Sequence, residues 1–236
     1  ARGEGVKLAN PQAKNGATVS EQPFSYAGLA TPPEEKNWVP FSFDGGLYMS
    51  RTLEPHRVVR CFASIPALGA STPCRDVYET SNEPLAKMQA EEGLISGGSP
   101  AILVPARSPL GVGHVFLTIS HTQHGRRYQN FAVAFEAKPP FRISHFSRVP
   151  LPLKCKERRP KPWPNSRVCF ASGIALVRNR LLVSYGSGDA EMHVWSSPWD
   201  EFQRRFLQMW QTKLPPLYSA QRHRSPGAES YATVLY

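Results

Sequence analysis

Short apolar runs alternate with turn signals along residues 35–196, and this pattern predicts the fold class. The runs are rich in β-branched and aromatic residues, which are favoured on a pleated sheet. They are WVPFSF, LYMSRTL, RVVRCFAS, PAILVPA, HVFLTISH, NFAVAFEA, FRISHFS, VCFASGIALV, RLLVSYG and MHVWSS. The pattern therefore predicts an all-β protein.

Turn residues separate these runs at regular intervals. Asp44-Gly45-Gly46 between two runs is a hairpin signature, and Asn179-Arg180 and the stretch 186–189 separate two further pairs. The chain also contains 23 prolines. This rhythm fits a sandwich, a barrel or a propeller, and the pattern does not choose among them.

The two ends of the chain differ from the strand-rich part. Residues 1–34 are polar and rich in Gly, Pro, Asn and Ser, which predicts an extended arm or linker. Residues 197–214 predict one helix, with an apolar stripe at helical spacing and Asp200-Glu201 near the start. The stripe consists of Trp199, Phe202, Phe206, Met209 and Trp210. We expect it to dock on the β-rich part, and we expect residues 215–236 to form a tail.

Composition narrows the choice of partners. The chain has 236 residues and a net charge of +10, which first suggests nucleic acid. The basic residues are spread out, however, and no zinc-finger spacing, RNP-like motif or basic helix accompanies them. We therefore expect a solvated basic face, or attraction to anionic groups, in place of nucleic-acid binding. No apolar run approaches the length of a membrane span.

The four cysteines form two local pairs in the sequence. Cys61 with Cys74, and Cys155 with Cys169, each bracket a loop that contains proline. Two disulfides in an oxidising lumen and four reduced thiols both fit this spacing. Without a CxxC motif or suitably spaced histidines, we expect no metal site, and no motif indicates a cofactor.

Five segments in order resemble the five-bladed β-propeller carbohydrate enzymes, chiefly the β-mannoside phosphorylases of glycoside-hydrolase family 130 and related mannosyltransferases. Plant and algal relatives of unassigned activity are similar too. The segments are EKNWVPF with GGLYMSRTLEPHR, then GGSPAILV, HVFLTISHT, YQNFAVAFEAKPPFRIS and VCFASGIALVRNRLLVSYGSGD. They cover residues 35–195. The resemblance implies propeller blades at 35–196 around a central funnel.

The resemblance also implies site residues. Lys36, next to Asn37, falls on a lysine that faces phosphate or sugar, and His121 falls on a phosphate-binding histidine. Asp189 falls on an aspartate that binds sugar hydroxyls. Arg51 or His56 corresponds to a second anion-binding position. For His56, a role as a turn histidine without ligand contact fits the sequence equally well. Further funnel contacts are expected at Ser99 and Tyr128.

Several histidines and one acid fall outside this set. His114, His124, His145 and His193 are interpreted as surface or satisfied histidines, and Glu136 as an exposed strand residue.

Together these features predict a carbohydrate-active protein that performs glycosyl transfer or phosphorolysis, with a sugar and phosphate or a nucleotide-sugar as partners. The resembling enzymes carry their catalytic aspartate upstream of the Lys-Asn motif, and residues 1–34 hold no counterpart. The chain is then a fragment, is completed by a partner chain that adds the missing blade, or has lost catalysis. The alternatives are a non-catalytic glycan-binding or scaffold propeller and a basic subunit of a large assembly. We expect the secretory lumen in preference to the cytoplasm.

Overall fold

The computed structural model describes residues 24–26, 37–62, 72–108, 111–124, 127–155, 168–188 and 190–209. The all-β prediction is confirmed, since the described residues form three sheets and two short helices. Within these ranges no helix is both long enough and apolar enough to cross a bilayer.

The first sheet has the strand order β1-β5-β4-β3-β2. Its strands are β1 (Phe24–Tyr26), β2 (Val39–Phe43), β3 (Gly46–Leu53), β4 (His56–Cys61) and β5 (Thr72–Thr80). β2 to β5 form an antiparallel meander, and β1 lies parallel to β5. The predicted hairpin at Asp44-Gly45 is confirmed, with positive φ at both residues. Apart from β1, the predicted arm at 1–34 lies outside the described residues.

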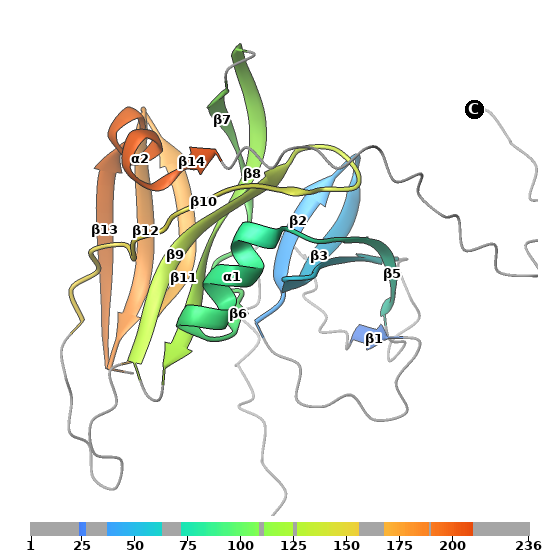
Figure 1. Cartoon of the computed structure of the whole chain (residues 1–236), viewed down its shortest axis with the longest axis horizontal. Helices are drawn as coiled ribbons and strands as arrows, with labels where there is room; N and C mark the ends of the chain where they lie inside the picture. Colours follow the sequence, from blue (N-terminus) through green and yellow to red (C-terminus); the bar gives the residue numbers. More distant parts are fainter. Residues whose placement is uncertain are drawn as a thin grey trace, which may run out of the picture.

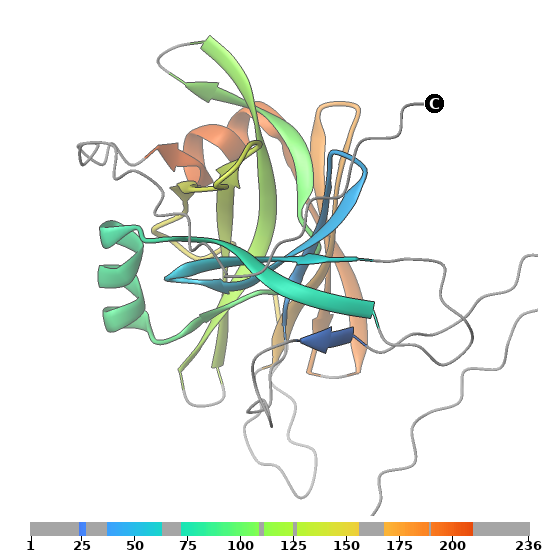
Figure 2. The ribbon, with the colours of Figure 1, turned by 90° about the vertical axis from the view of Figure 1, so that its right-hand side faces the viewer.

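The second sheet has the order β14-β10-β9-β8-β6, with β7 also paired to β8. Its strands are β6 (Ile95–Ser96), β7 (Ile102–Ser108), β8 (Gly111–His124), β9 (Arg127–Glu136), β10 (Ile143–Phe146) and β14 (Gln208–Met209). β6 and β7 pair with different parts of the long strand β8. β6 and β7 therefore act together as the first strand of this meander, and the GGSP segment at 97–100 interrupts them. In Figures 1 and 2 the β7–β8 hairpin projects beyond the rest of the sheet.

The third sheet is a three-stranded antiparallel meander of β11 (Cys169–Val177), β12 (Arg180–Ser187) and β13 (Glu191–Pro198). Figure 1 shows the three sheets side by side, with the second in the middle. Alternate side chains of β8 and β9 consequently enter two different cores. Leu117 and Ala134 pack toward the third sheet, whereas Phe116 and Phe135 pack with residues of the first.

Phe141, in the connection from β9 to β10, is the centre of the core between the first two sheets. It is fully buried, and its ring centroid lies 5.1–6.5 Å from those of six other aromatic rings. These rings belong to Phe41, Phe43, Tyr48, Tyr78, Phe116 and Phe135. The backbone of Phe141 has φ of 60°, a region that bulky residues rarely occupy. Packing therefore holds this residue in an unfavourable conformation.

The predicted helix at 197–214 is shorter in the structure. α2 spans Trp199–Phe206, and Leu207 leaves the helical conformation before β14 pairs with β10. The three buried α2 residues Trp199, Phe202 and Phe206 already cover the core, as predicted for a docking face. Met209, expected on the helical stripe, lies in β14 opposite His145. The prediction was wrong here because helical spacing does not reveal a competing strand partner. Trp210 and the predicted tail lie outside the described residues.

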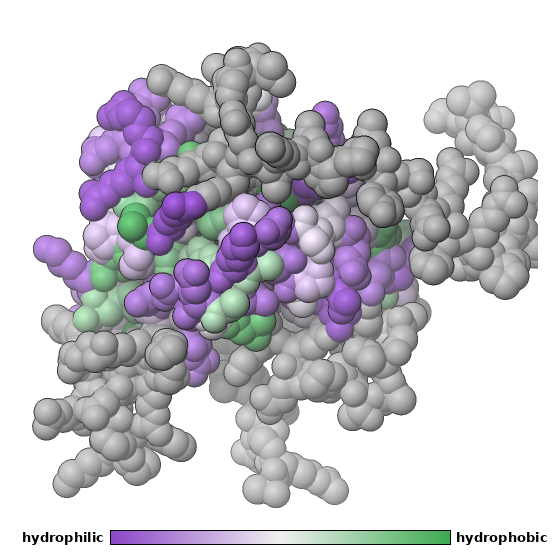
Figure 3. All heavy atoms as spheres, in the orientation of Figure 1, coloured by the Kyte–Doolittle hydropathy of each residue, from purple (hydrophilic) through white to green (hydrophobic). Residues whose placement is uncertain are grey.

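A second helix was not predicted. α1 (Glu83–Glu92) begins at Asn82, whose side-chain oxygen accepts the N–H of Leu85 at 3.0 Å. Pro84 in its first turn is typical of a helix start. The Asn-Glu-Pro sequence was therefore the signal from which the start of this helix could have been predicted. Figure 3 shows hydrophilic side chains gathered where α1 covers the molecule, while Leu85 on its inner side is buried.

Truncation of Phe141 tests its role in the core. We expect Phe141→Ala to lower the free energy of unfolding by about 3–5 kcal/mol, because it empties the site on which six rings pack. Urea unfolding measures the change. The matched control is Phe24→Ala, because Phe24 is 51% exposed. This variant should change the free energy of unfolding by less than about 0.5 kcal/mol. Equal losses for the two variants would contradict the assignment.

Candidate functional site

Two of the residues predicted for the site lie outside the described residues. These are Lys36 and Asp189. Their described neighbours are placed, however. Asn37 lies against the GGSP segment, as detailed below, and the Gly188 N–H donates to the Val168 carbonyl at 2.8 Å, beside the start of β11.

The GGSP segment brings the three sheets together. A Cβ on Gly97 would collide with the Asn37 carbonyl at the start of the first sheet. One on Gly98 would collide with the carbonyl of Ile119 in β8 and would lie 3.0 Å from the carbonyl of Ala171 in β11. Glycine is required at both positions because a neighbouring backbone carbonyl approaches too closely for any side chain. Segments that are 60 or more residues apart along the chain are thus neighbours here.

Ser99 continues this junction as a structural residue. It is fully buried, its N–H donates to the Ile119 carbonyl at 3.0 Å, and its Oγ accepts the Ile119 N–H at 2.9 Å. The Thr118 hydroxyl donates to the Ser99 carbonyl at 2.7 Å. These bonds bridge the interruption between β6 and β7. They leave Ser99 turned into the protein and not toward a ligand.

His121 and Tyr128 lie together at the end of β8 and the start of β9. The His121 ring is 4% exposed and lies edge-on to two rings, at 4.8 Å from Tyr128 and 5.3 Å from Phe170 of β11. Tyr128 and Phe170 are themselves half-buried. Residue 121 also pairs with Ser96, which precedes Gly97, and Phe170 pairs with Gly186. One continuous set of contacts therefore runs from Asn37 through Gly97 and His121 to the β12 turn.

His56 lies apart from this cluster and is 1% exposed. Its Nδ1–H donates to the Phe141 carbonyl at 2.8 Å, so the Nε2 of the neutral ring accepts from the Ser50 hydroxyl at 3.0 Å. Burial lowers the pKa of His56 to about 4, although the bond to Phe141 opposes this shift. Because both ring nitrogens are bonded to the protein, the structure favours the interpretation of His56 as a turn histidine over that of a residue that contacts substrate.

Arg51 and Glu54 are likewise held by the protein. The Arg51 guanidinium lies 3.8 Å from the Asp76 carboxylate, so the first sheet already supplies it with an anion. Glu54 Oε2 accepts the Asn82 N–H at 2.8 Å at the start of α1. Burial raises the pKa of the Glu54 carboxyl, and the bond from Asn82 opposes that shift.

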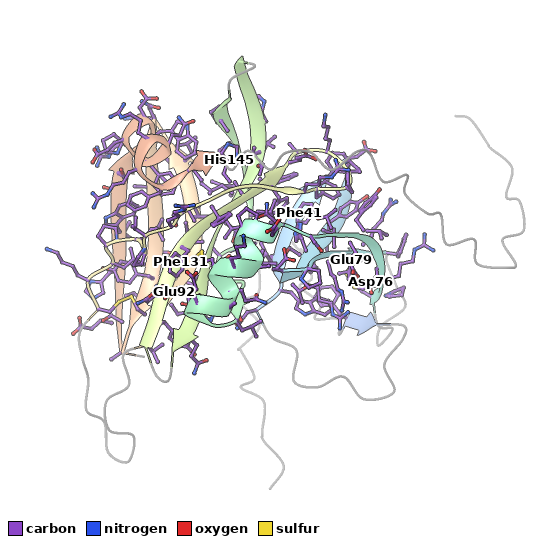
Figure 4. All side chains as sticks on the ribbon, viewed as in Figure 1. Phe41, Asp76, Glu79, Glu92, Phe131 and His145 are labelled. Carbon is purple, nitrogen blue, oxygen red and sulfur yellow. A yellow bond between two sulfur atoms is a disulfide. The ribbon has the colours of Figure 1, made fainter. Side chains whose placement is uncertain are left out.

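A pocket of about 400 Å³ lies elsewhere, at the base of the β7–β8 hairpin. Its polar lining residues are His114, Glu136, Lys138, Ser144 and His145, and its apolar lining residues are Ala106, Gly113, Val115 and Ala137. Figure 4 labels His145 beside β14. The prediction of an exposed Glu136 was wrong, because Glu136 follows the buried Ala134 on the same face of β9 and its Oε2 is buried. The two-residue spacing from Ala132 and Ala134 places Glu136 on the inner face of β9, and this spacing could have predicted its partial burial.

The cysteine spacing left disulfides and reduced thiols open, and the structure contains the disulfides. One links Cys61 to Cys74, which face each other across β4 and β5, and the other links Cys155 to Cys169. Among the described residues, no group of three or more His, Cys, Asp or Glu side chains is placed to hold a metal ion.

Comparison with known proteins adds no relative: no family model, curated protein or solved structure matches the chain. The resemblance to the propeller phosphorylases therefore stays a prediction.

The buried His56 predicts a pH-dependent stability. Its folded pKa lies below the ordinary value of 6.5, so the unfolded chain binds more protons between these values. The contribution of neutral His56 to the free energy of unfolding is complete above pH 6.5 and is lost as the pH falls toward 4, by about 3 kcal/mol in total. We expect His56→Gln to flatten this part of the curve of unfolding free energy against pH. His193→Gln, at a half-exposed position, should keep the wild-type slope. Identical slopes in all three proteins would refute a neutral buried His56.

Proposed function

We propose that the chain is a carbohydrate-binding protein of the propeller type, whose sugar site lies beside Tyr128 and Phe170. The observation that carries the proposal is the contact set from Asn37 through Gly97 and His121 to Phe170. Segments that resemble funnel motifs of the propeller enzymes adjoin one another in it, although they come from three sheets.

The sheet topology supports a propeller arrangement. β2 to β5 form a four-stranded antiparallel meander, and the interrupted strand β6/β7 with β8, β9 and β10 forms another. β11 to β13 form a third meander of three strands. Propeller blades are such meanders, and their first strands approach the axis. The first strands β2, β6 and β11 adjoin the GGSP segment here.

The chemistry at Tyr128 suits a sugar. Half-buried aromatic rings offer apolar surface to the C–H face of a sugar ring, and the Tyr128 hydroxyl can exchange hydrogen bonds with its hydroxyls. His121 packs edge-on against both rings and fixes their positions. The resemblance assigns Lys36 as the ammonium and Asp189 as the carboxylate of this site, although both lie outside the described residues, and Asn37 borders the site.

Binding is the part of the carbohydrate function that the described residues support best. Transfer or phosphorolysis requires an acid. The acids beside the predicted anion-binding residues are engaged, Glu54 at the start of α1 and Asp76 with the Arg51 guanidinium. We propose glycan binding as the function, with phosphorolysis or glycosyl transfer as the extension that a turnover assay tests. The two disulfides support an oxidising compartment such as the secretory lumen.

A binding experiment tests the sugar site. We expect the protein to bind a mannose oligosaccharide by calorimetry, and Tyr128→Ala to weaken the affinity about tenfold, a loss of about 1.4 kcal/mol. Tyr128→Phe is the matched control because it keeps the ring, so it should lose less than about threefold. If no oligosaccharide from a mannose-based and glucose-based panel binds, or if both variants bind like wild type, the proposed site is wrong.

The same preparations distinguish binding from turnover. Mannosyl phosphate and nucleotide-sugar donors are incubated with protein and acceptor sugar, and released phosphate or nucleotide is measured. Binding without release identifies a glycan-binding module. Release of phosphate or nucleotide by the wild-type protein identifies an enzyme, and Asp189→Asn should then lower release and binding together, because Asp189 is proposed to bind sugar hydroxyls.

A further inference from the structure

The pocket at the base of the β7–β8 hairpin is separate from the proposed sugar site. Ala106, Gly113, Val115 and Glu136 occupy one face of β7, β8 and β9, because Ala106 pairs with Gly113 and Val115 with Glu136. His145 lies opposite Ala134, two residues from Glu136 on that face. A Cβ placed on Gly113 would meet no atom within 4 Å, so the glycine leaves this space open.

Two buried polar atoms in this pocket have no hydrogen-bond partner among the described residues: Nε2 of His145 and Oε2 of Glu136. His145 is only 4% exposed, which makes its bare nitrogen costly in the absence of a ligand. Both residues line a volume of about 400 Å³, within the range of small-molecule sites.

The hydrogen bonds around His145 determine what Nε2 offers. The Ser144 hydroxyl contacts the Ala134 carbonyl at 3.3 Å and the His145 Nδ1 at 2.9 Å. Both bonds form together only if Ser144 donates to the carbonyl and Nδ1–H donates to Ser144 Oγ. Nε2 then carries a lone pair and accepts. Burial lowers the pKa of His145, which keeps the ring in this neutral form.

The pocket therefore presents two acceptors, one of them a carboxylate oxygen, on an otherwise largely apolar wall. Glu136 and His145 are diagonal neighbours on adjacent strands, with a register shift between Ile143 and His145, and both line the pocket, so one donor group in the pocket can address both side chains. An alcohol has one proton to donate and no charge, whereas a primary ammonium has three and a positive charge.

From this arrangement we propose that the pocket binds a small primary ammonium with an apolar tail, held by Glu136 Oε2 and His145 Nε2, with the tail against Ala106 and Val115. This site does not depend on the proposed sugar binding. Lys138 lies at the same pocket and is exposed, so its ammonium opposes a bound cation, and solvent screens this repulsion.

The test uses n-pentylamine and its neutral counterpart 1-pentanol with the full chain at pH 7. Ligand-observed NMR and calorimetry should show pentylamine binding at least tenfold more tightly than pentanol. Glu136→Gln removes the charge and should reduce pentylamine affinity at least tenfold while leaving pentanol within twofold. Equal affinity for the two probes, or no pentylamine binding, would overturn the proposal.

A second variant fills the pocket and leaves both acceptors in place. Gly113→Val introduces a β-branched side chain that strands accept, and the space above Gly113 is empty. We expect an unchanged thermal midpoint and loss of pentylamine binding. The mannose oligosaccharide serves as the independent readout, since its binding should be the same in wild type and in both pocket variants. Undiminished pentylamine binding in Gly113→Val would place the amine elsewhere and overturn the assignment.

Discussion

The fold depends on how tightly the Phe141 side chain is enclosed between the first and second sheets. Six rings from both sheets surround it, its backbone is held at a positive φ, and His56 binds its carbonyl at 2.8 Å. Dispersion and burial at this one position must outweigh an unfavourable backbone and a buried imidazole. Because Phe141 packs against rings of both sheets, it sets how closely these two sheets approach each other.

The polar residues near these contacts fall into two groups, those that the protein itself engages and those at the proposed sites. His56, Ser99 and Glu54 are polar residues in motif-like sequences, and each is engaged with the protein around the inter-sheet contacts. In contrast, the rings of Tyr128 in the second sheet and Phe170 in the third are half-buried, and Glu136 Oε2 and His145 Nε2 in the second sheet have no hydrogen-bond partner among the described residues. Partial exposure and burial without a partner are the features on which the two proposed sites rest.

The sequence was sufficient for the local features. Strand periodicity and the Asp44-Gly45 hairpin follow from neighbours along the chain, and both are present. The cysteine spacing left disulfides and reduced thiols open, and both local pairs are disulfides in the structure. The sequence failed where the partner is remote. α2 ends at Phe206 because β10 offers Met209 a strand partner, and Glu136 is half-buried because it lines a pocket with residues of the β7–β8 hairpin and β10. The candidate site was predicted only in outline: the motifs around Gly97 and His121 adjoin, but no local pattern distinguishes the packed His56 from the His145 that faces a pocket.

The three sheets meet at the GGSP segment, and native-state hydrogen exchange on Gly98→Ala tests whether they form one unit. The new Cβ would collide with the Ile119 carbonyl of β8 and would lie 3.0 Å from the Ala171 carbonyl of β11. Amides of β3, β8 and β12, one strand from each sheet, should lose protection together, while Gly113→Ala, whose Cβ meets open space, should exchange like wild type. Loss of protection confined to residues next to position 98, with the three strands unaffected, would contradict it.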